Sequence, residues 1–214
     1  MKKDKRLIFV ILLLIGIGTL SIGLATFSNI LTIRSSTTVS PDESSFKVFI
    51  SGNAKDINYL FVNYGSSYPD ANHKPSGNSG HIIRNSTNQS SISDINVTFT
   101  GPNQTATWTV YIHNQNNYDV YYSYNQNEPN LKCIAGEGTT DELVQKACSC
   151  ISNQLKRKES TTYTKLEPTS KYKVSKNSVE EIKLEIKYNR CDYLADGPFD
   201  IEIGDYEIIT TSAP

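Results

Sequence analysis

Residues 106–113, Ala-Thr-Trp-Thr-Val-Tyr-Ile-His, alternate between core-forming side chains and side chains suited to a surface. Successive side chains of a β-strand point to opposite faces, so this stretch predicts a strand that buries Ala106, Trp108, Val110 and Ile112. Similar alternation recurs at 46–50, 95–99, 120–124, 182–188 and 199–203, with turn-forming clusters between many of these stretches. Strands with one apolar face pack as antiparallel sheets face to face, so the predicted fold class is mainly β, a β-sandwich.

Two stretches interrupt this pattern. Residues 139–148 predict a short helix, with Thr139 as N-cap and Glu142 completing a capping box. Because the helix lies between cysteines, we interpret residues 125–172 as a cysteine-stapled excursion from the sandwich. Residues 65–93 are rich in Ser, Asn, Gly and Pro with few large apolar residues, and they predict a long loop excursion.

The N-terminus predicts a membrane segment. Residues 7–27 carry no charge and span roughly 30 Å as a helix, which matches the hydrocarbon core of a bilayer. Residues 1–6 hold four basic side chains and one acid, so the positive-inside rule keeps them in the cytoplasm. Residues 28–214 are therefore predicted to be extracytoplasmic, with the C-terminus outside the cell. Either the segment stays as a single-pass anchor, or cleavage after the small-x-small site ending at Ala25 releases a secreted protein.

Four cysteines follow the predicted anchor, at Cys133, Cys148, Cys150 and Cys191. In an oxidising exterior they predict two disulfide bonds. Cys148 and Cys150 are too close in sequence to pair well, so we expect Cys133 to pair with one of them and Cys191 with the other. The spacing fits no familiar zinc site, and no metal or other cofactor is predicted.

The arrangement resembles a class of Gram-positive surface proteins. Residues 23–28, Gly-Leu-Ala-Thr-Phe-Ser, are similar to the segment in which their anchors end. Residues 101–114 resemble their Pro-Gly-x-x-x-Thr-Tyr-Thr-Val strand motif, and residues 196–208 their closing strand with a Gly-Asp kink. The similarity extends to the TasA and camelysin-like group of matrix-fibre proteins, from whose fibre-forming members the cysteine insert departs. The resemblance implies an immunoglobulin-like sandwich on a cell surface and implies little about chemistry.

Catalytic and metal-binding patterns are weak in this sequence. His73 and His81 are expected to be solvated in the polar loop, and His113 is expected to end a strand on its outward face. No H-E-x-x-H, G-x-S-x-G or phosphate-binding loop occurs. Six acids crowd the C-terminus and raise the alternative of calcium, namely Asp192, Asp196, Asp200, Glu202, Asp205 and Glu207. Alternation and turn preference explain most of them without a ligand.

Tyrosines gather in the strand around Trp108 and in its successor. Tyr111 and Tyr121 are expected to face outward, where their rings could stack on a sugar or contact a protein. The plain alternative is that tyrosine simply suits strands.

The net charge of −1 comes without any basic stripe, so nucleic acid is not expected as a partner. The predicted function is that of a non-enzymatic, membrane-anchored surface protein. Its roles would be structural, adhesive or matrix-associated, through self-association or contact with a cell-surface protein or glycan. The alternative is a glycan- or peptide-binding module that uses the outward tyrosines.

Overall fold

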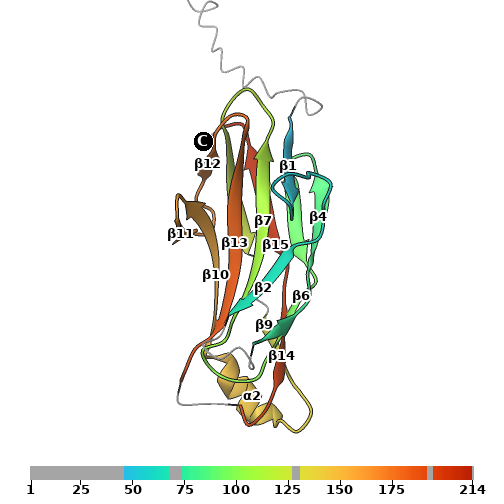
Figure 1. Cartoon of the computed structure of the whole chain (residues 1–214), viewed down its shortest axis with the longest axis vertical. Coiled ribbons are helices and arrows are strands. Elements are labelled where there is room, and N and C mark those ends of the chain that lie inside the picture. The colour runs from blue at the N-terminus through green and yellow to red at the C-terminus, as the bar shows by residue number, and fades with distance from the viewer. Residues whose placement is uncertain (1–45, 68–73, 127–130, 192–194, 214) are drawn as a thin grey trace, which may run out of the picture. The chain divides into compact units, whose positions relative to one another are not determined.

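A computed structural model describes residues 46–67, 74–126, 131–191 and 195–213 of the chain. The described part is mainly β, as the alternation predicts, with a single short helix (Figure 1). The strands are β1 (Val48–Ser51), β2 (Asn63–Ser67), β3 (Ser76–Gly77), β4 (His81–Ser86), β5 (Gln89–Ser93), β6 (Ile95–Phe99), β7 (Thr105–Asn114), β8 (Val120–Gln126), β9 (Leu131–Ala135), β10 (Ile151–Glu159), β11 (Thr162–Lys165), β12 (Tyr172–Val174), β13 (Ser178–Tyr188), β14 (Phe199–Ile203) and β15 (Tyr206–Thr211). The helix is α2 (Asp141–Cys148).

These strands form three antiparallel sheets (Figure 1). The first sheet has the order β1-β7-β13-β10-β11, and β2 also pairs with β7. The second sheet has the order β12-β8-β15-β5-β4, and the third has the order β3-β6-β14-β9. The first and second sheets bury one face each and meet through inter-sheet contacts such as the hydrogen bond from Tyr122 Oη to Glu180 at 2.7 Å. The arrangement is therefore sandwich-like, as predicted.

The core follows the alternation of β7. Ala106, Trp108, Val110 and Ile112 are at most 1% exposed, which confirms the face predicted to be buried. The indole nitrogen of Trp108 donates to the carbonyl of Asn78 at 2.8 Å, so this large side chain is buried without an unpaired donor. The partner strand β13 supplies the neighbouring core residues on the same face, which are Ile182, Leu184 and Ile186.

Both predicted excursions are wrong as descriptions of the fold. The range 65–93 contains β3, β4 and β5. The range 125–172 contains β9, β10 and β11 and ends at the first residue of β12. Each of these strands pairs within a sheet. Within the described residues of the second range, the longest segment outside the sheets is the one between β9 and β10, which includes α2; residues 160–161 and 166–171 also lie outside the strands. The physical reason is that pairing with a patterned neighbour compensates for a weakly patterned strand.

The helix begins two residues later than predicted and lacks the capping box. Thr140, and not Thr139, is the N-cap, and it makes no side-chain cap hydrogen bond. The hydroxyl of Thr139 instead donates to the carbonyl of Pro198 at 2.7 Å. Glu142 does not reach back to the cap, because its carboxylate pairs with Lys146 one turn later at 2.6 Å.

Two disulfide bonds fix the helix at its C-terminal end. Cys133 in β9 is bonded to Cys148, and Cys150 is bonded to Cys191 beyond β13. This is one of the two pairings that the sequence predicts, and the described residues include no free cysteine. The buried side chains of α2 are Val144 and Ala147. The first bond thus attaches the helix to β9, and the second attaches the residue before β10 to the segment that follows β13.

The predicted membrane segment, residues 7–27, lies outside the described residues, as do residues 1–6 and the possible cleavage site at Ala25. Among the residues that the structure does describe, none belongs to a helix with the length and apolar character needed to cross a bilayer.

Candidate functional site

The two tyrosines predicted to bind a ligand do not share a surface. Tyr111 and Tyr121 are both partly exposed and both alternate with buried neighbours, so each faces outward as expected. However, Tyr111 lies on β7 in the first sheet, whereas Tyr121 lies on β8 in the second. The outer faces of two packed sheets point in opposite directions. Any binding by these residues must therefore occur at separate sites.

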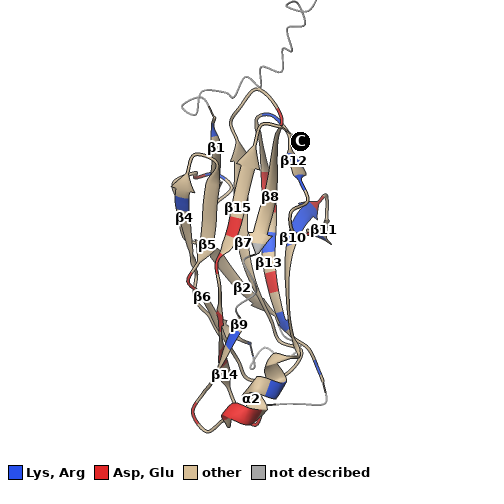
Figure 2. Cartoon of the chain, turned by 180° about the vertical axis from the view of Figure 1, so that it is seen from behind, with Lys and Arg blue, Asp and Glu red and all other residues tan. Residues whose placement is uncertain are grey.

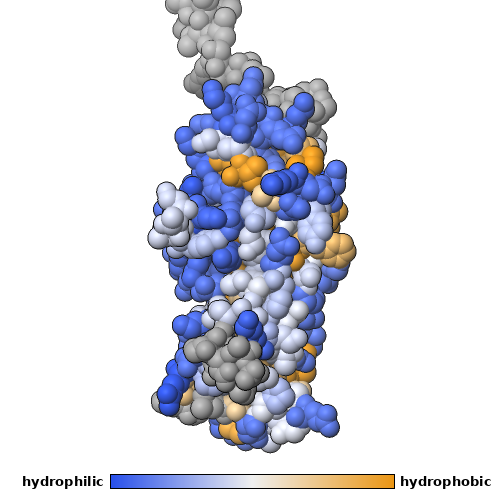
Figure 3. All heavy atoms as spheres, in the orientation of Figure 1, coloured by the Kyte–Doolittle hydropathy of each residue, from blue (hydrophilic) through white to orange (hydrophobic). Residues whose placement is uncertain are grey.

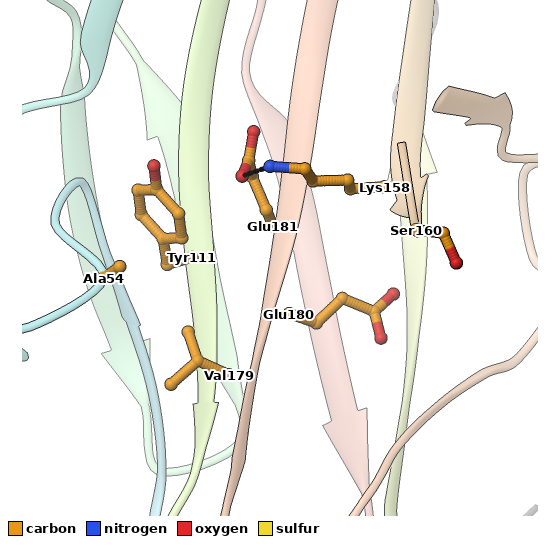
Figure 4. Close-up of a pocket in the computed structure, with 7 residues that line it drawn as sticks. All are labelled: Ala54, Tyr111, Lys158, Ser160, Val179, Glu180 and Glu181. Carbon is orange, nitrogen blue, oxygen red and sulfur yellow. Dashed lines mark hydrogen bonds and ion pairs between the residues drawn. The ribbon is translucent and has the colours of Figure 1, made fainter. Parts of the chain in front are cut away.

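A hollow of about 400 Å³ lies beside Tyr111 on the first sheet. Figure 4 shows Tyr111, Glu181 and Lys158 arranged along neighbouring strands, with Val179 below Tyr111. Ala54 and Ser160 border the hollow from the turns that follow β1 and β10, and the lining also includes Glu180. Val179 is 47% exposed, which is unusual for an aliphatic side chain of this protein. The hollow therefore combines an aromatic ring, an aliphatic side chain and an ion pair.

The polar side of the hollow is held by several partners. The Lys158 ammonium donates to Glu181 Oε2 at 2.8 Å, and the Tyr163 hydroxyl donates to Glu181 Oε1. Although burial raises the pKa of Glu181, the hydrogen bonds from Lys158 and Tyr163 outweigh it and leave that pKa below its usual value. The hydrogen bond to Glu181 in turn raises the pKa of Lys158. Both groups are consequently charged at neutral pH.

This ion pair belongs to a wider set along β10 and β13. Figure 2 shows basic segments of β10 beside charged segments of β13. Lys156 pairs with Glu185 at 2.7 Å on the same outer face as Lys158. On the inner face, Arg157 pairs with Glu180 at 3.2 Å, and burial raises the pKa of Glu180. Glu180 also accepts from Tyr122 on the opposite sheet at 2.7 Å, so we assign these inner groups a structural role between the sheets.

A second hollow, of about 290 Å³, lies between β1 and β4. Its side chains come from the edge of the first sheet and from the edge of the second, and they are Phe46, Val48, Phe49, Ile50, Arg84, Ser86, Thr87 and Ser90. The guanidinium of Arg84 lies 5.5 Å from the ring centroid of Phe49 and donates to the carbonyls of Ile50 and Ile57. We call this hollow the edge groove. Figure 3 shows apolar atoms at the surface around β1.

His113 is buried, although it lies on the outward face of its strand as the sequence predicts. It belongs to β7 and is only 4% exposed. Ser51 Oγ donates to the carbonyl of Asn53 at 2.7 Å, which leaves this oxygen to accept a hydrogen bond from His113 Nε2 at 2.8 Å. Burial lowers the pKa of His113, and the charge of Arg84 lowers it further. The hydrogen bond to the Asn53 carbonyl and the charge of Asp56 raise this pKa, but by less, so it stays below its usual value. The imidazole is therefore held neutral.

The stability of the fold is expected to decrease in mild acid because of His113. The unfolded chain takes up a proton near pH 6.5, whereas the folded protein resists it. The contribution of His113 is therefore fully present above that pH and is lost as the pH falls towards the lower folded-state pKa. Urea unfolding at about pH 7.5 and about pH 5.5 measures this effect. In His113→Gln the decrease between these pH values should be smaller, and an unchanged decrease would contradict the assignment.

The remaining predicted sites do not converge. His73 and Asp192 lie outside the described residues. His81 forms a long ion pair with Asp94 at 3.4 Å. The C-terminal acids bind separate partners: Asp196 accepts from Thr140, Asp200 from Thr98, Glu202 from Lys132 and Glu207 from Gln89. Within the described ranges, no group of three or more His, Cys, Asp or Glu side chains is arranged to hold a metal ion.

Comparison with known proteins adds little to this geometry. No protein-family model matches the chain, and no curated protein gives a significant match. Among solved structures, the chain is weakly similar to the enzymatically active domain of tailspike protein 4 from bacteriophage CBA120. The similarity has 11% identity and a TM-score of 0.14, and it covers 80% of this chain and only 20% of the tailspike chain. A TM-score this low supports no inference about fold or activity.

Proposed function

We propose that this chain is a non-enzymatic surface protein whose β-sandwich associates with further copies of itself in adhesion or matrix assembly. In this proposal residues 7–27 anchor the chain or direct its export, and the sandwich is immunoglobulin-like and lies outside a Gram-positive cell. The two disulfide bonds support an oxidising environment. The observation that carries the proposal is the edge groove beside β1.

The backbone of β1 has one side available for pairing. The carbonyl of Lys47 accepts from Gln115, so Lys47 and, by alternation, Phe49 and Ser51 direct their backbone groups to β7. Val48 and Ile50 direct theirs to the opposite side, where the carbonyl of Ile50 accepts from Arg84 at 3.3 Å and the backbone groups of Val48 remain available. Among the described strands only β7 pairs with β1. Such an edge is a template for adding a strand from another chain.

The edge groove gives an added strand a place for its side chains. Phe46 and Phe49 are half-buried apolar side chains that line the groove beside the available backbone groups, together with Val48 and Ile50, which are only 8% and 2% exposed. A strand that pairs with β1 directs alternate side chains towards the groove, where they would leave water. Backbone pairing supplies affinity in this mode, and the shape of the groove selects the side chains.

The full-length chain in detergent is expected to form oligomers that grow with concentration in sedimentation velocity experiments. Val48→Pro tests the edge, because the N–H that it removes points away from β7 and proline is tolerated at such positions. Since Val48 is only 8% exposed, circular dichroism must first show that the variant folds. It should weaken association at least about tenfold, which corresponds to about 1.4 kcal/mol.

The control is Ile83→Lys, which charges a 47%-exposed apolar side chain on β4 that is absent from the lining of the edge groove. Association of this variant should remain unchanged. A chain that stays monomeric at high concentration, or equal weakening by both substitutions, would count against the proposal.

A further inference from the structure

The hollow beside Tyr111 differs from the edge groove in having no backbone available for pairing. Its floor is formed by β7 and β13, which pair with each other over ten residues. Each of the two strands also pairs on its other side, β7 with β1 and β2, and β13 with β10. A peptide therefore cannot join the sheet here as an additional strand. Recognition at this hollow must rely on side chains.

Charge restricts the ligand as well. The lining holds one cation, Lys158, and two anions: Glu181 pairs with Lys158 at 2.8 Å, and Glu180 is neutralised by Arg157 on the inner face at 3.2 Å. An anionic ligand would approach Glu181 and a cationic ligand would approach Lys158, so neither sign is favoured. The side chain of Glu181 is 18% exposed and that of Lys158 is 43% exposed, so both remain accessible to a neutral ligand.

Hydrogen-bonding capacity remains at the rim. An ammonium group carries three donors, and Lys158 uses one of them for Glu181. The Tyr111 hydroxyl has no hydrogen-bond partner among the described residues. Burial and the charge of Glu181 raise the pKa of Tyr111 despite the opposing effect of Lys158, so this phenol stays protonated and can donate. Each carboxylate oxygen of Glu181 can accept more than one hydrogen bond.

We propose that this hollow binds a neutral saccharide unit, with Tyr111 and Val179 against the C–H face of the sugar and the Lys158–Glu181 pair at its hydroxyls. A sugar ring combines an apolar face with a polar rim, which matches the two parts of the hollow. A volume of about 400 Å³ lies within the range of small-ligand sites. This binding is separate from the self-association at β1, because the two sites use different residues and different surfaces of the sandwich.

Titration calorimetry of the full-length chain in detergent tests the proposal with three neutral probes: cellotetraose, maltotetraose and tetra-N-acetylchitotetraose. At least one should bind saturably with a dissociation constant of about 1 mM or below. Tetragalacturonate is the anionic counterpart and tetra-alanine the peptide counterpart. Absence of saturable binding of every neutral probe up to about 10 mM, or tighter binding of either counterpart, would overturn the proposal.

Variants locate the site. Tyr111→Ala should raise the dissociation constant of the best neutral probe at least about tenfold, since the contact of the ring with the sugar face and the hydrogen bond from the phenol are both lost. The matched control is Tyr121→Ala, which removes a partly exposed strand tyrosine from the other sheet and should leave binding within about twofold. Lys158→Met keeps the aliphatic stem, removes the donors and should also weaken binding. It provides a second test of the site in case Tyr111→Ala does not fold. Equal effects at Tyr111 and Tyr121, or no effect of Lys158→Met, would contradict this location.

Discussion

Trp108→Ala is expected to lower the free energy of unfolding by about 4 kcal/mol. Trp108 is 1% exposed and lies in an interior strand of the first sheet, so its removal leaves a cavity that the surrounding strands cannot close. The carbonyl of Asn78 also loses the hydrogen bond from the indole. Because Trp108 is the single tryptophan of the chain, unfolding in urea must be followed by circular dichroism.

The control for this substitution is Tyr59→Ala. Tyr59 is 40% exposed, so its replacement should change the free energy of unfolding by no more than about 0.5 kcal/mol. A loss below about 1 kcal/mol for Trp108→Ala would show that the packing around β7 is looser than the structure indicates.

Replacing Cys150 and Cys191 together with serine is expected to lower the free energy of unfolding by about 4 kcal/mol. This disulfide closes the longer loop, with a sequence separation of 41, and so restricts the unfolded chain more strongly. The disulfide between Cys133 and Cys148 closes a shorter loop, with a separation of 15. Replacing these two cysteines with serine should lower the free energy of unfolding by about 3 kcal/mol. Urea unfolding of both double variants measures the two losses.

Treatment of the unaltered protein with a reductant provides the control. If the disulfides act through the unfolded chain, the reduced protein should be less stable than either double variant. Equal stability of the oxidised and reduced protein would contradict this account.

The sequence was sufficient where strands bury one face completely. β14 alternates throughout, β7 alternates from Thr105 to Ile112, and β13 alternates from Ile182 to Tyr188, so the buried residues of these stretches could be assigned in advance. β10 could not be found in this way, because Leu155 is its one fully buried apolar residue. Its position depends on β13, whose acids pair with Lys156 and Lys158. Complementary charge between the two stretches was the available signal.

β4 and β5 were missed for a related reason. Ile82 of β4 and Ile92 of β5 are buried, but each is the one buried apolar residue of its strand, and serines occupy three of the other four positions of β5. Such a strand acquires its conformation by pairing with β15, which sequence patterns do not reveal.

The candidate site was only partly predictable. Alternation correctly placed Tyr111 and Tyr121 outside the core, but it could not show that the chain changes sheets between β7 and β8. After that change, outward side chains point to the other side of the molecule. Likewise, the residues that line the hollow beside Tyr111 include Lys158 of β10 and Val179 and Glu181 of β13, which follow Tyr111 by more than 40 positions in the sequence. Their proximity is a property of strand pairing.

The connectivity of the cysteines also determines how the chain would respond to mechanical tension applied at its two ends. Force would pass from Cys133 across its disulfide to Cys148, through Ser149 to Cys150, and across the second disulfide to Cys191. The helix and strands β10 to β13 lie within the two closed loops and are shielded from the pull. With separations of 15 and 41, the loops withhold about 190 Å of chain from extension. A tethered molecule would thus extend about 190 Å less than the same chain without disulfides, even after its other strands had separated.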